Sequence, residues 1–194
     1  MDQTKDRRVM RTKRMLRQAL VELIQEKEFQ KITVTDVVKH ADINRGTFYT
    51  YYRDVYDLLE KVENEMIEEF RLIHDENLPS SEHRYSQQLV SNLHPLLEQA
   101  VGFLEKNRTM VCALLRASTT DGFKDKMIRT IEDLRLSVLP DTQEKEIFLT
   151  RFLAAGAVGV MSKWIMEENS PSKEILIDML DELLRKTLPQ SDER

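Results

Sequence analysis

Apolar residues recur every three or four positions along most of this chain, and this spacing predicts a protein built from helices. In the first predicted helix, over residues 6–26, one apolar face contains Leu16, Ala19, Leu20, Leu23 and Ile24. Further helices are predicted over residues 45–51, 54–73, 86–106, 108–117, 124–138, 143–168 and 173–188, with a polar loop from His74 to Tyr85. With a short helix before residue 41, this gives an all-α fold of about nine helices.

The short helix rests on an apolar stripe of Val34, Val37 and Val38. These β-branched residues would also suit a strand. A hydroxyl of Thr33 or Thr35 can accept an unpaired backbone N–H at a helix start, so we favour a helix.

Composition supports the same fold class and limits the location of the protein. Five glycines and five prolines are few for 194 residues, which disfavours a strand-rich fold with many tight turns. A single cysteine, Cys112, excludes an intrachain disulfide and fits a reducing compartment. The basic N-terminal segment lacks the apolar core of a signal peptide. The longest apolar stretch, residues 148–161, is shorter than the roughly 18 residues of a membrane span. We therefore expect a cytoplasmic protein.

Charge is unevenly distributed. The net charge is −5 for the whole chain, which alone would argue against nucleic acid. Residues 1–56, however, carry 12 Lys and Arg against 8 Asp and Glu, and seven of these basic residues lie between Lys5 and Arg17. A basic N-terminal region, here called the head, followed by an acidic remainder suggests that only the N-terminal region binds a polyanion.

Two short helices joined by a tight turn occupy this head. The turn is Ala41-Asp42-Ile43, and Asn44 is a favourable N-cap for the helix over residues 45–51. This is the geometry of a helix-turn-helix, in which the second helix enters the major groove. A further cap, Asp54, opens the following long helix.

The residues of this unit resemble the TetR family of transcriptional regulators over roughly residues 8–65. The resemblance rests on ITVTDVV at residues 32–38, Ala41, Ile43, NRGTFYTYY at residues 44–52, Asp54 and Leu58. It implies a three-helix DNA-binding domain over residues 1–56 and a helical effector-binding and dimerisation domain over residues 57–194. A Phe-Leu-x-x-Gly pattern that ends at Trp164 is similar to one subgroup, which includes regulators of dihydroxyacetone kinase genes.

The resemblance also implies a set of DNA contacts. Phosphates would be met by Thr35, Tyr49 and Tyr51, and base edges by Asn44, Arg45 and Thr47. Gly46 would let the recognition helix approach the groove closely. An arginine can bond guanine with two hydrogen bonds, which discriminates bases by about 1–3 kcal/mol.

Two features qualify these contacts. An aromatic run such as FYTYY is usually core, and here Phe48 and Tyr52, four positions apart, form the inward face. The family commonly places a phosphate-binding lysine just after the cap of the fourth helix, where this chain has Val55. Arg53 or the basic first helix are the candidates to replace that contact.

A single helix-turn-helix reads few base pairs, so we expect a homodimer. Small and apolar residues near the C-terminus suggest a four-helix interface formed by Gly156, Leu176, Met179, Leu180, Leu183 and Leu184. The alternative is that this stripe belongs to the intramolecular core; we favour the interface.

An effector pocket is expected among the apolar residues of the C-terminal part. Candidate lining residues are Phe103, Met110, Leu114, Met127, Phe152 and Trp164, each of which also suits ordinary core. His94 and Cys112 are the polar candidates. The effector would be a small apolar or amphipathic molecule whose binding to a repressor favours a dimer that releases its DNA operator.

An enzyme is disfavoured. The four histidines lack metal-ligand spacing such as HExxH, and the chain has no glycine-rich phosphate loop and no nucleophile elbow. We therefore expect no catalytic residue, no metal and no cofactor. The remaining alternative is a ligand-independent DNA-binding adaptor whose helical body binds another protein. An internal pocket would favour the effector hypothesis, and an exposed apolar patch outside the dimer surface would favour the adaptor.

Overall fold

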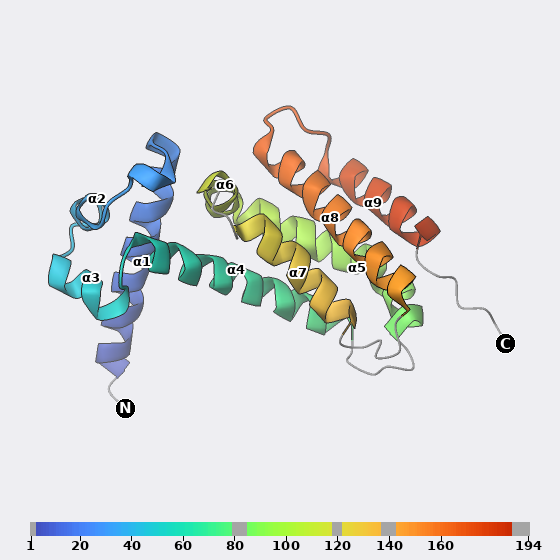
Figure 1. Cartoon of the computed structure of the whole chain (residues 1–194), viewed down its shortest axis with the longest axis horizontal. Helices are drawn as coiled ribbons and strands as arrows, with labels where there is room; N and C mark the ends of the chain where they lie inside the picture. Colours follow the sequence, from blue (N-terminus) through green and yellow to red (C-terminus); the bar gives the residue numbers. More distant parts are fainter. Residues whose placement is uncertain (1–2, 79–84, 118–121, 137–142, 188–194) are drawn as a thin grey trace. The chain divides into compact units, whose positions relative to one another are not determined.

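The computed structural model describes residues 3–78, 85–117, 122–136 and 143–187, which form helices and turns without any strand (Figure 1). The helices are α1 (Gln3–Glu26), the short 3-10 helix η1 (Phe29–Lys31), α2 (Val34–His40), α3 (Arg45–Tyr51), α4 (Val55–Asn77), α5 (Tyr85–Lys106), α6 (Arg108–Ala117), α7 (Phe123–Leu136), α8 (Glu144–Met166) and α9 (Lys173–Thr187). The expected all-α fold is confirmed, including the bounds of α3.

The chain forms two compact units. Unit 1 contains residues 1–66 and 109–122, and unit 2 contains residues 67–108 and 123–194. This division differs from the expected boundary after residue 56 because the first half of α4 packs in unit 1, where Leu58 is buried and Glu65 pairs with Arg17 of α1. It also assigns nearly all of α6 to unit 1, where Val111, Ala113, Leu114 and Ala117 bury one face of the helix.

The core of unit 1 forms where the apolar faces of its helices meet. Leu16 and Leu20 of α1, Val37 of α2, Phe48 of α3 and Leu58 of α4 have no exposed surface. Burying an aliphatic or aromatic side chain of this size contributes about 1.5–3 kcal/mol each. These contacts hold the two short helices α2 and α3, which are too short to be stable alone.

Unit 2 contains the second half of α4 with α5, α7, α8 and α9. Helix α7 packs beside α8, and α9 packs beside α5. The turn between α8 and α9 is fixed by two hydrogen bonds. Trp164 Nε1 donates to the carbonyl of Pro171 (2.8 Å), and Ser170 Oγ donates to the carbonyl of Trp164 (2.8 Å). Trp164 therefore has a structural role at this turn.

The loop expected to begin at His74 starts later. Helix α4 continues to Asn77, and the Leu78 N–H still donates to the His74 carbonyl at 2.8 Å. This last turn of α4 contains the charged residues Asp75 and Glu76, which favour a loop on sequence alone. In the structure these two are exposed, whereas His74 and Leu78 are buried. Residues 79–84 and 137–142, which include the expected break at Pro140 and Asp141, lie outside the described residues.

Candidate DNA interface and internal cavity

Hydrogen bonds at both helix starts define the α2–turn–α3 unit. Thr33 caps α2: its Oγ1 accepts the Asp36 N–H (3.2 Å), and Asp36 accepts the Thr33 N–H (2.8 Å), which forms a capping box. The ammonium of Lys27 at 2.9 Å and these bonds from Thr33 lower the pKa of Asp36 to about 2. Of the two threonines considered as caps, Thr33 is therefore the one used.

The turn reverses the chain at Asp42, which adopts a left-handed conformation with φ 52°. Asn44 then caps α3, as its Oδ1 accepts the Gly46 N–H at 2.7 Å. A Cβ at Gly46 would lie only 3.2 Å from that oxygen. Glycine at this position therefore leaves room for the cap, in addition to the close approach to DNA expected of it.

The exposed face of α3 brings together three of the residues expected to touch DNA. The Arg45 guanidinium donates to the Tyr49 hydroxyl (3.0 Å) and to Thr35 Oγ1 (3.5 Å), and it lies over the Tyr49 ring at 5.6 Å from the centroid. Tyr49 is 48% exposed. The arrangement presents one cation and two hydroxyls from α2 and α3 on the same surface.

The other α3 side chains, and that of the C-cap Tyr52, show the inward face that the periodicity predicts. Phe48 and Tyr52 are buried, and burial raises the pKa of the Tyr52 phenol. Thr47 and Tyr51 are half-buried.

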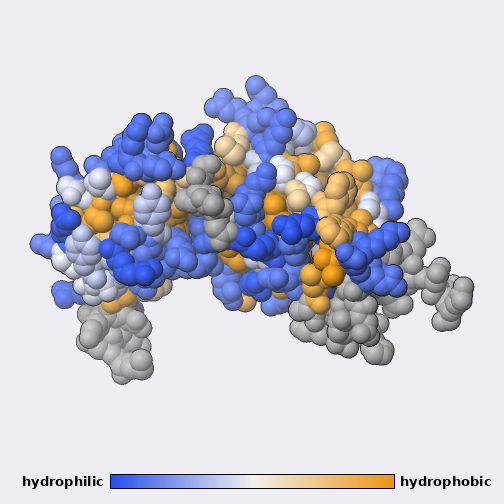
Figure 2. Space-filling view, viewed as in Figure 1, coloured by the Kyte–Doolittle hydropathy of each residue, from blue (hydrophilic) through white to orange (hydrophobic). Residues whose placement is uncertain are grey.

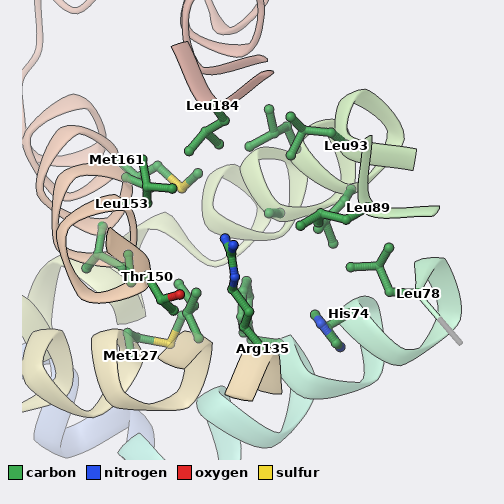
Figure 3. Close-up of a pocket in the computed structure, with 18 of the residues that line it drawn as sticks. His74, Leu78, Leu89, Leu93, Met127, Arg135, Thr150, Leu153, Met161 and Leu184 are labelled. Atoms are coloured by element: carbon green, nitrogen blue, oxygen red, sulfur yellow. The ribbon is translucent and has the colours of Figure 1, made fainter. Parts of the chain in front are cut away.

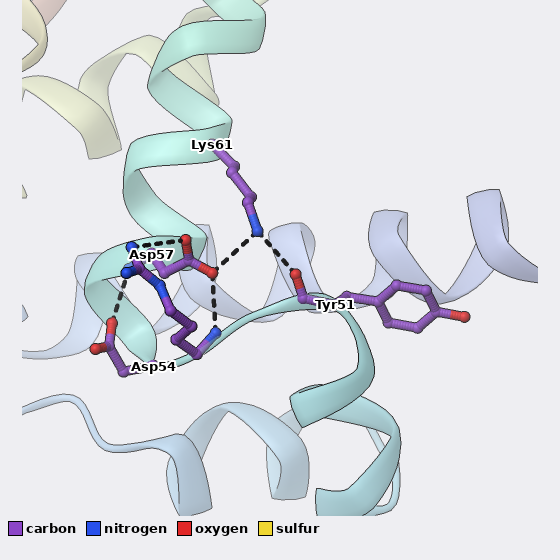
Figure 4. A network of polar contacts seen from close by, with 5 residues as sticks. Tyr51, Asp54, Asp57 and Lys61 are labelled. Carbon is purple, nitrogen blue, oxygen red and sulfur yellow. Dashed lines mark hydrogen bonds and ion pairs between the residues drawn. The ribbon is translucent and has the colours of Figure 1, made fainter.

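A polar network at the α3–α4 junction was not anticipated from the sequence (Figure 4). The nearly buried carboxylate of Asp57 accepts the Arg53 backbone N–H at 2.9 Å and pairs with the Lys61 ammonium at 3.0 Å. Lys61 also donates to the carbonyl of Tyr51 at 2.9 Å and lies 5.1 Å from the Tyr52 ring centroid. The bond from the Arg53 N–H, followed by that from Lys61, lowers the pKa of Asp57.

This network ties the last residue of α3 to the first two turns of α4. The Asp57 N–H donates to Asp54 Oδ1 (2.8 Å), so Asp54 caps α4 as expected. The spacing Asp54-x-x-Asp57, with Lys61 four residues further on, is the sequence signal that could have revealed it. The cation at the C-terminal end of α3 is also favourable for the helix dipole.

Val55 cannot replace the family's phosphate-binding lysine because its side chain has no charge and no hydrogen-bond donor, and it is only 4% exposed. The neighbouring Arg53 side chain is 82% exposed, with one 3.4 Å contact to Asp57. Arg53 therefore stays a candidate for that contact.

The basic face of α1 is the other candidate. Arg7, Arg11, Arg14 and Arg17 line one shallow surface hollow, so they share a face as their spacing predicts. Arg17 is held by Glu65 of α4, with nitrogen–oxygen distances of 2.6 and 2.9 Å. The three outer arginines remain exposed or partly exposed.

Unit 2 encloses an apolar cavity of about 150 Å³ (Figure 3). Its lining comes from α4, α5, α7, α8 and α9, together with Leu78, and consists of Phe70, His74, Leu78, Leu89, Leu93, Leu96, Leu97, Ala100, Leu104, Met127, Ile131, Arg135, Thr150, Leu153, Ala154, Ala157, Val158, Met161 and Leu184.

Only Met127 of the six expected pocket residues lines this cavity. Met110 and Leu114 belong to unit 1, and Phe152 is 72% exposed on α8. Phe103 and Trp164 lie in unit 2 outside the lining. Neither polar candidate reaches the cavity either, since His94 lies within 4.0 Å of Asp181 and Cys112 belongs to unit 1.

The residues expected at a dimer interface fall into three environments. Leu176 and Leu180 are buried within the unit, and Leu184 lines the cavity. Met179 and Leu183 are 39% and 54% exposed, and Gly156 is exposed on α8.

Exposed apolar side chains form one stripe on each of the two helices. On α8 they are Phe148, Phe152 and Val160, and on α9 they are Ile175, Met179 and Leu183, all at helical spacing. Figure 2 shows hydrophobic atoms at the surface of unit 2. Within the described residues, α8 is the one helix long and apolar enough by composition to cross a membrane, with 22% of its window buried. The exposed stripe accounts for this apolar character.

Among the described residues, no group of three or more His, Cys, Asp or Glu is placed to hold a metal ion.

Comparison with known proteins identifies both parts of the chain. Residues 16–62 match the family model described as bacterial regulatory proteins, tetR family, and residues 91–186 match one described as transcriptional regulator C-terminal region. An uncharacterised HTH-type transcriptional regulator of Bacillus subtilis, YxbF, is 24% identical over 88% of this chain, which spans only 44% of that protein.

Two solved structures share the fold. The dihydroxyacetone kinase operon activator DhaS has a TM-score of 0.59 and 22% identity, and covers 91% of this chain and 96% of its own. A TetR transcriptional regulator from Streptococcus agalactiae has a TM-score of 0.61 and 22% identity, and covers 93% and 97%. With the capped helix-turn-helix and the all-helical fold, the two family-model matches show that the chain belongs to the TetR family of bacterial transcriptional regulators.

Proposed function

We propose that this regulator is a cytoplasmic homodimeric repressor that binds an operator through α3 and releases it when a small molecule enters the cavity of unit 2. The observation that carries the DNA-binding part is the exposed cluster of Arg45, Thr35 and Tyr49, held at the start of a doubly capped helix-turn-helix. Arg45 is the base reader of this cluster, and the hydroxyls meet phosphates.

The exposed stripes on α8 and α9 support the dimer. Gly156 lies in the α8 stripe, and a Cβ there would meet no atom within 4 Å in its own chain. A glycine that its own subunit does not require suits a close helix contact with a second subunit. Two helices from each subunit would then form a four-helix bundle.

The cavity supports an effector over the adaptor alternative. It is apolar, it lies within one compact unit, and several helices contribute to its wall. Ligand sites in helical proteins are typically of this kind. The proposed dimer would cover the exposed stripes of α8 and α9, so they do not by themselves favour a protein partner.

Selection of bound fragments from a random DNA pool tests the proposal. We expect a palindromic site whose half-sites are spaced by whole helical turns. Arg45→Ala should lose preference for that site while it keeps salt-sensitive binding to other DNA. Arg116→Ala, which removes an exposed arginine of α6, is the matched control and should bind as the parent does. Equal loss on all sequences would contradict base reading by Arg45.

The sign of regulation is tested separately. A promoter that overlaps the selected site should be silenced by the protein in an in vitro transcription assay. One structural relative is named an operon activator, so a rise in transcription would replace the repressor part of the proposal and leave DNA recognition intact.

A further inference from the structure

The cavity of unit 2 is apolar except at three of its nineteen lining residues, His74, Arg135 and Thr150. None of the nineteen is acidic. His74 Nδ1 lies 3.1 Å from the carboxylate of its neighbour Asp75, which is outside the lining. Arg135 therefore brings a charged guanidinium to this wall, because an arginine stays protonated in proteins.

Figure 3 shows where that charge lies. Arg135 comes from the last described turn of α7, and its guanidinium extends into the middle of the cavity. The hydroxyl of Thr150, on α8, points toward the same space. Beyond the guanidinium, Leu93, Leu153, Met161 and Leu184 surround the apolar part of the space.

Thr150 indicates that a polar group is missing from the cavity. Its side chain is 2% exposed, and its Oγ1 makes no hydrogen bond to any described part of the chain. A buried hydroxyl without a partner loses its hydrogen bonds to water and gains none in return, so such groups are normally satisfied. A ligand with an acceptor between Thr150 and Arg135 would satisfy it.

We propose that the effector of this regulator is an apolar carboxylate. Its carboxylate accepts hydrogen bonds from the Arg135 guanidinium and the Thr150 hydroxyl, and its hydrocarbon body lies among the leucines and Met161. This inference rests on the proposed effector function and names the ligand class for it. Arg135 is the one lysine or arginine among the described lining residues, which favours a monoanion.

The volume of the cavity limits the size of the ligand's hydrocarbon part. A dry apolar cavity of about 150 Å³ holds one benzene molecule. Methionine is unbranched and adaptable, and Met127 and Met161 both line this cavity, so its wall can adjust to a short alkyl chain. The ligand is thus a short or medium-chain carboxylate and not a large polycyclic molecule.

Calorimetric titration of the 194-residue chain tests the inference with three probes that have the same number of carbons: octanoate, 1-octanol and octylamine. We expect octanoate to bind at least about tenfold more tightly than octylamine, as charge-assisted hydrogen bonds are the strong ones. Arg135→Leu should weaken octanoate about tenfold to a hundredfold and leave 1-octanol unchanged or tighter. Arg135→Lys keeps the charge and should restore part of the preference.

Two further variants complete the set. Thr150→Val has nearly the same shape without the hydroxyl and should weaken octanoate severalfold. Arg151→Leu is the control. It removes the arginine next to Thr150 in the sequence, whose side chain is 70% exposed, and this variant should bind all three probes as the parent does. Equal binding of octanoate and octylamine, or unchanged octanoate binding by Arg135→Leu, would overturn the proposed carboxylate site.

Operator binding, measured in parallel, separates this inference from the proposed function. If octanoate binds as expected and releases the selected operator, the carboxylate site and the proposed release mechanism both hold. If it binds as expected and the operator affinity stays the same, the site holds and the release mechanism fails. If none of the three probes binds a protein that still binds its operator, the carboxylate inference fails while DNA recognition stands.

Discussion

Replacing Asp57 should disturb the α3–α4 junction more than replacing any neighbouring surface carboxylate. Asp57 is 7% exposed, and its carboxylate accepts the Arg53 N–H while it pairs with Lys61. Removing the side chain leaves that N–H without its acceptor. It also frees Lys61 from one of the two groups that hold it against the last carbonyl of α3.

The magnitude follows from the exposure of each partner. A hydrogen bond to a charged group contributes about 1.5–3 kcal/mol. The Lys61 side chain is 49% exposed, so water screens its ion pair, which adds at most about 1 kcal/mol. We therefore expect Asp57→Ala to lower the free energy of unfolding by about 2–3 kcal/mol, mainly through the Arg53 N–H. Asp57→Asn keeps an acceptor and should lose about 1 kcal/mol.

Urea denaturation followed by circular dichroism measures these differences. Glu60→Ala, at an exposed position of the same helix, is the matched control and should change the free energy of unfolding by less than about 0.5 kcal/mol. Operator binding should weaken for Asp57→Ala even where the protein is fully folded, because the end of α3 is no longer held. If Asp57→Ala were as stable as Glu60→Ala, the junction would not have the role described.

Three shorter predictions concern the same unit. The pKa of Asp36 is lowered from 3.8 to about 2, so its contribution to stability is present above about pH 4 and is lost as the pH falls through 2; unfolding free energies of the parent and Asp36→Asn should converge over that interval. Arg53→Ala should weaken binding to all DNA sequences alike and reduce the slope of log affinity against log salt by about one, measured by fluorescence anisotropy. Tyr49→Phe removes the hydroxyl that holds Arg45 and should weaken operator binding by about 0.5–1.5 kcal/mol in the same assay.

The sequence predicted the helix-turn-helix well because its determinants are local. Thr33, Asn44 and Asp54 cap the helices that follow them, and a cap depends on residues two or three positions away. The bounds of α3 follow from such local rules. The Asp57 network obeys them too, because its partners Asp54 and Lys61 lie three and four residues away along the chain.

The cavity could not be predicted because hydrophobic periodicity identifies an apolar face without saying what covers it. Phe152 looked suited to a pocket and is exposed on α8. Arg135, the residue on which the proposed carboxylate site depends, is a charged residue near a helix end, which on sequence alone indicates a solvated position. Its location follows only from how α4, α5, α7, α8 and α9 pack around one space.

In helix α9 the apolar residues at helical spacing include some that are buried inside the subunit and some that are exposed. This difference provides a test of the dimer. Leu180 is 3% exposed and packs inside unit 2, so Leu180→Glu should destabilise the subunit itself by several kcal/mol. Met179 and Leu183 are 39% and 54% exposed, so a subunit tolerates charge there. Met179→Glu with Leu183→Glu should therefore yield folded monomers by light scattering, with a parent-like circular dichroism spectrum and weaker operator binding. Exposed Asp178→Lys on the same helix is the control and should stay dimeric. A double variant with the mass of a dimer would place the interface elsewhere.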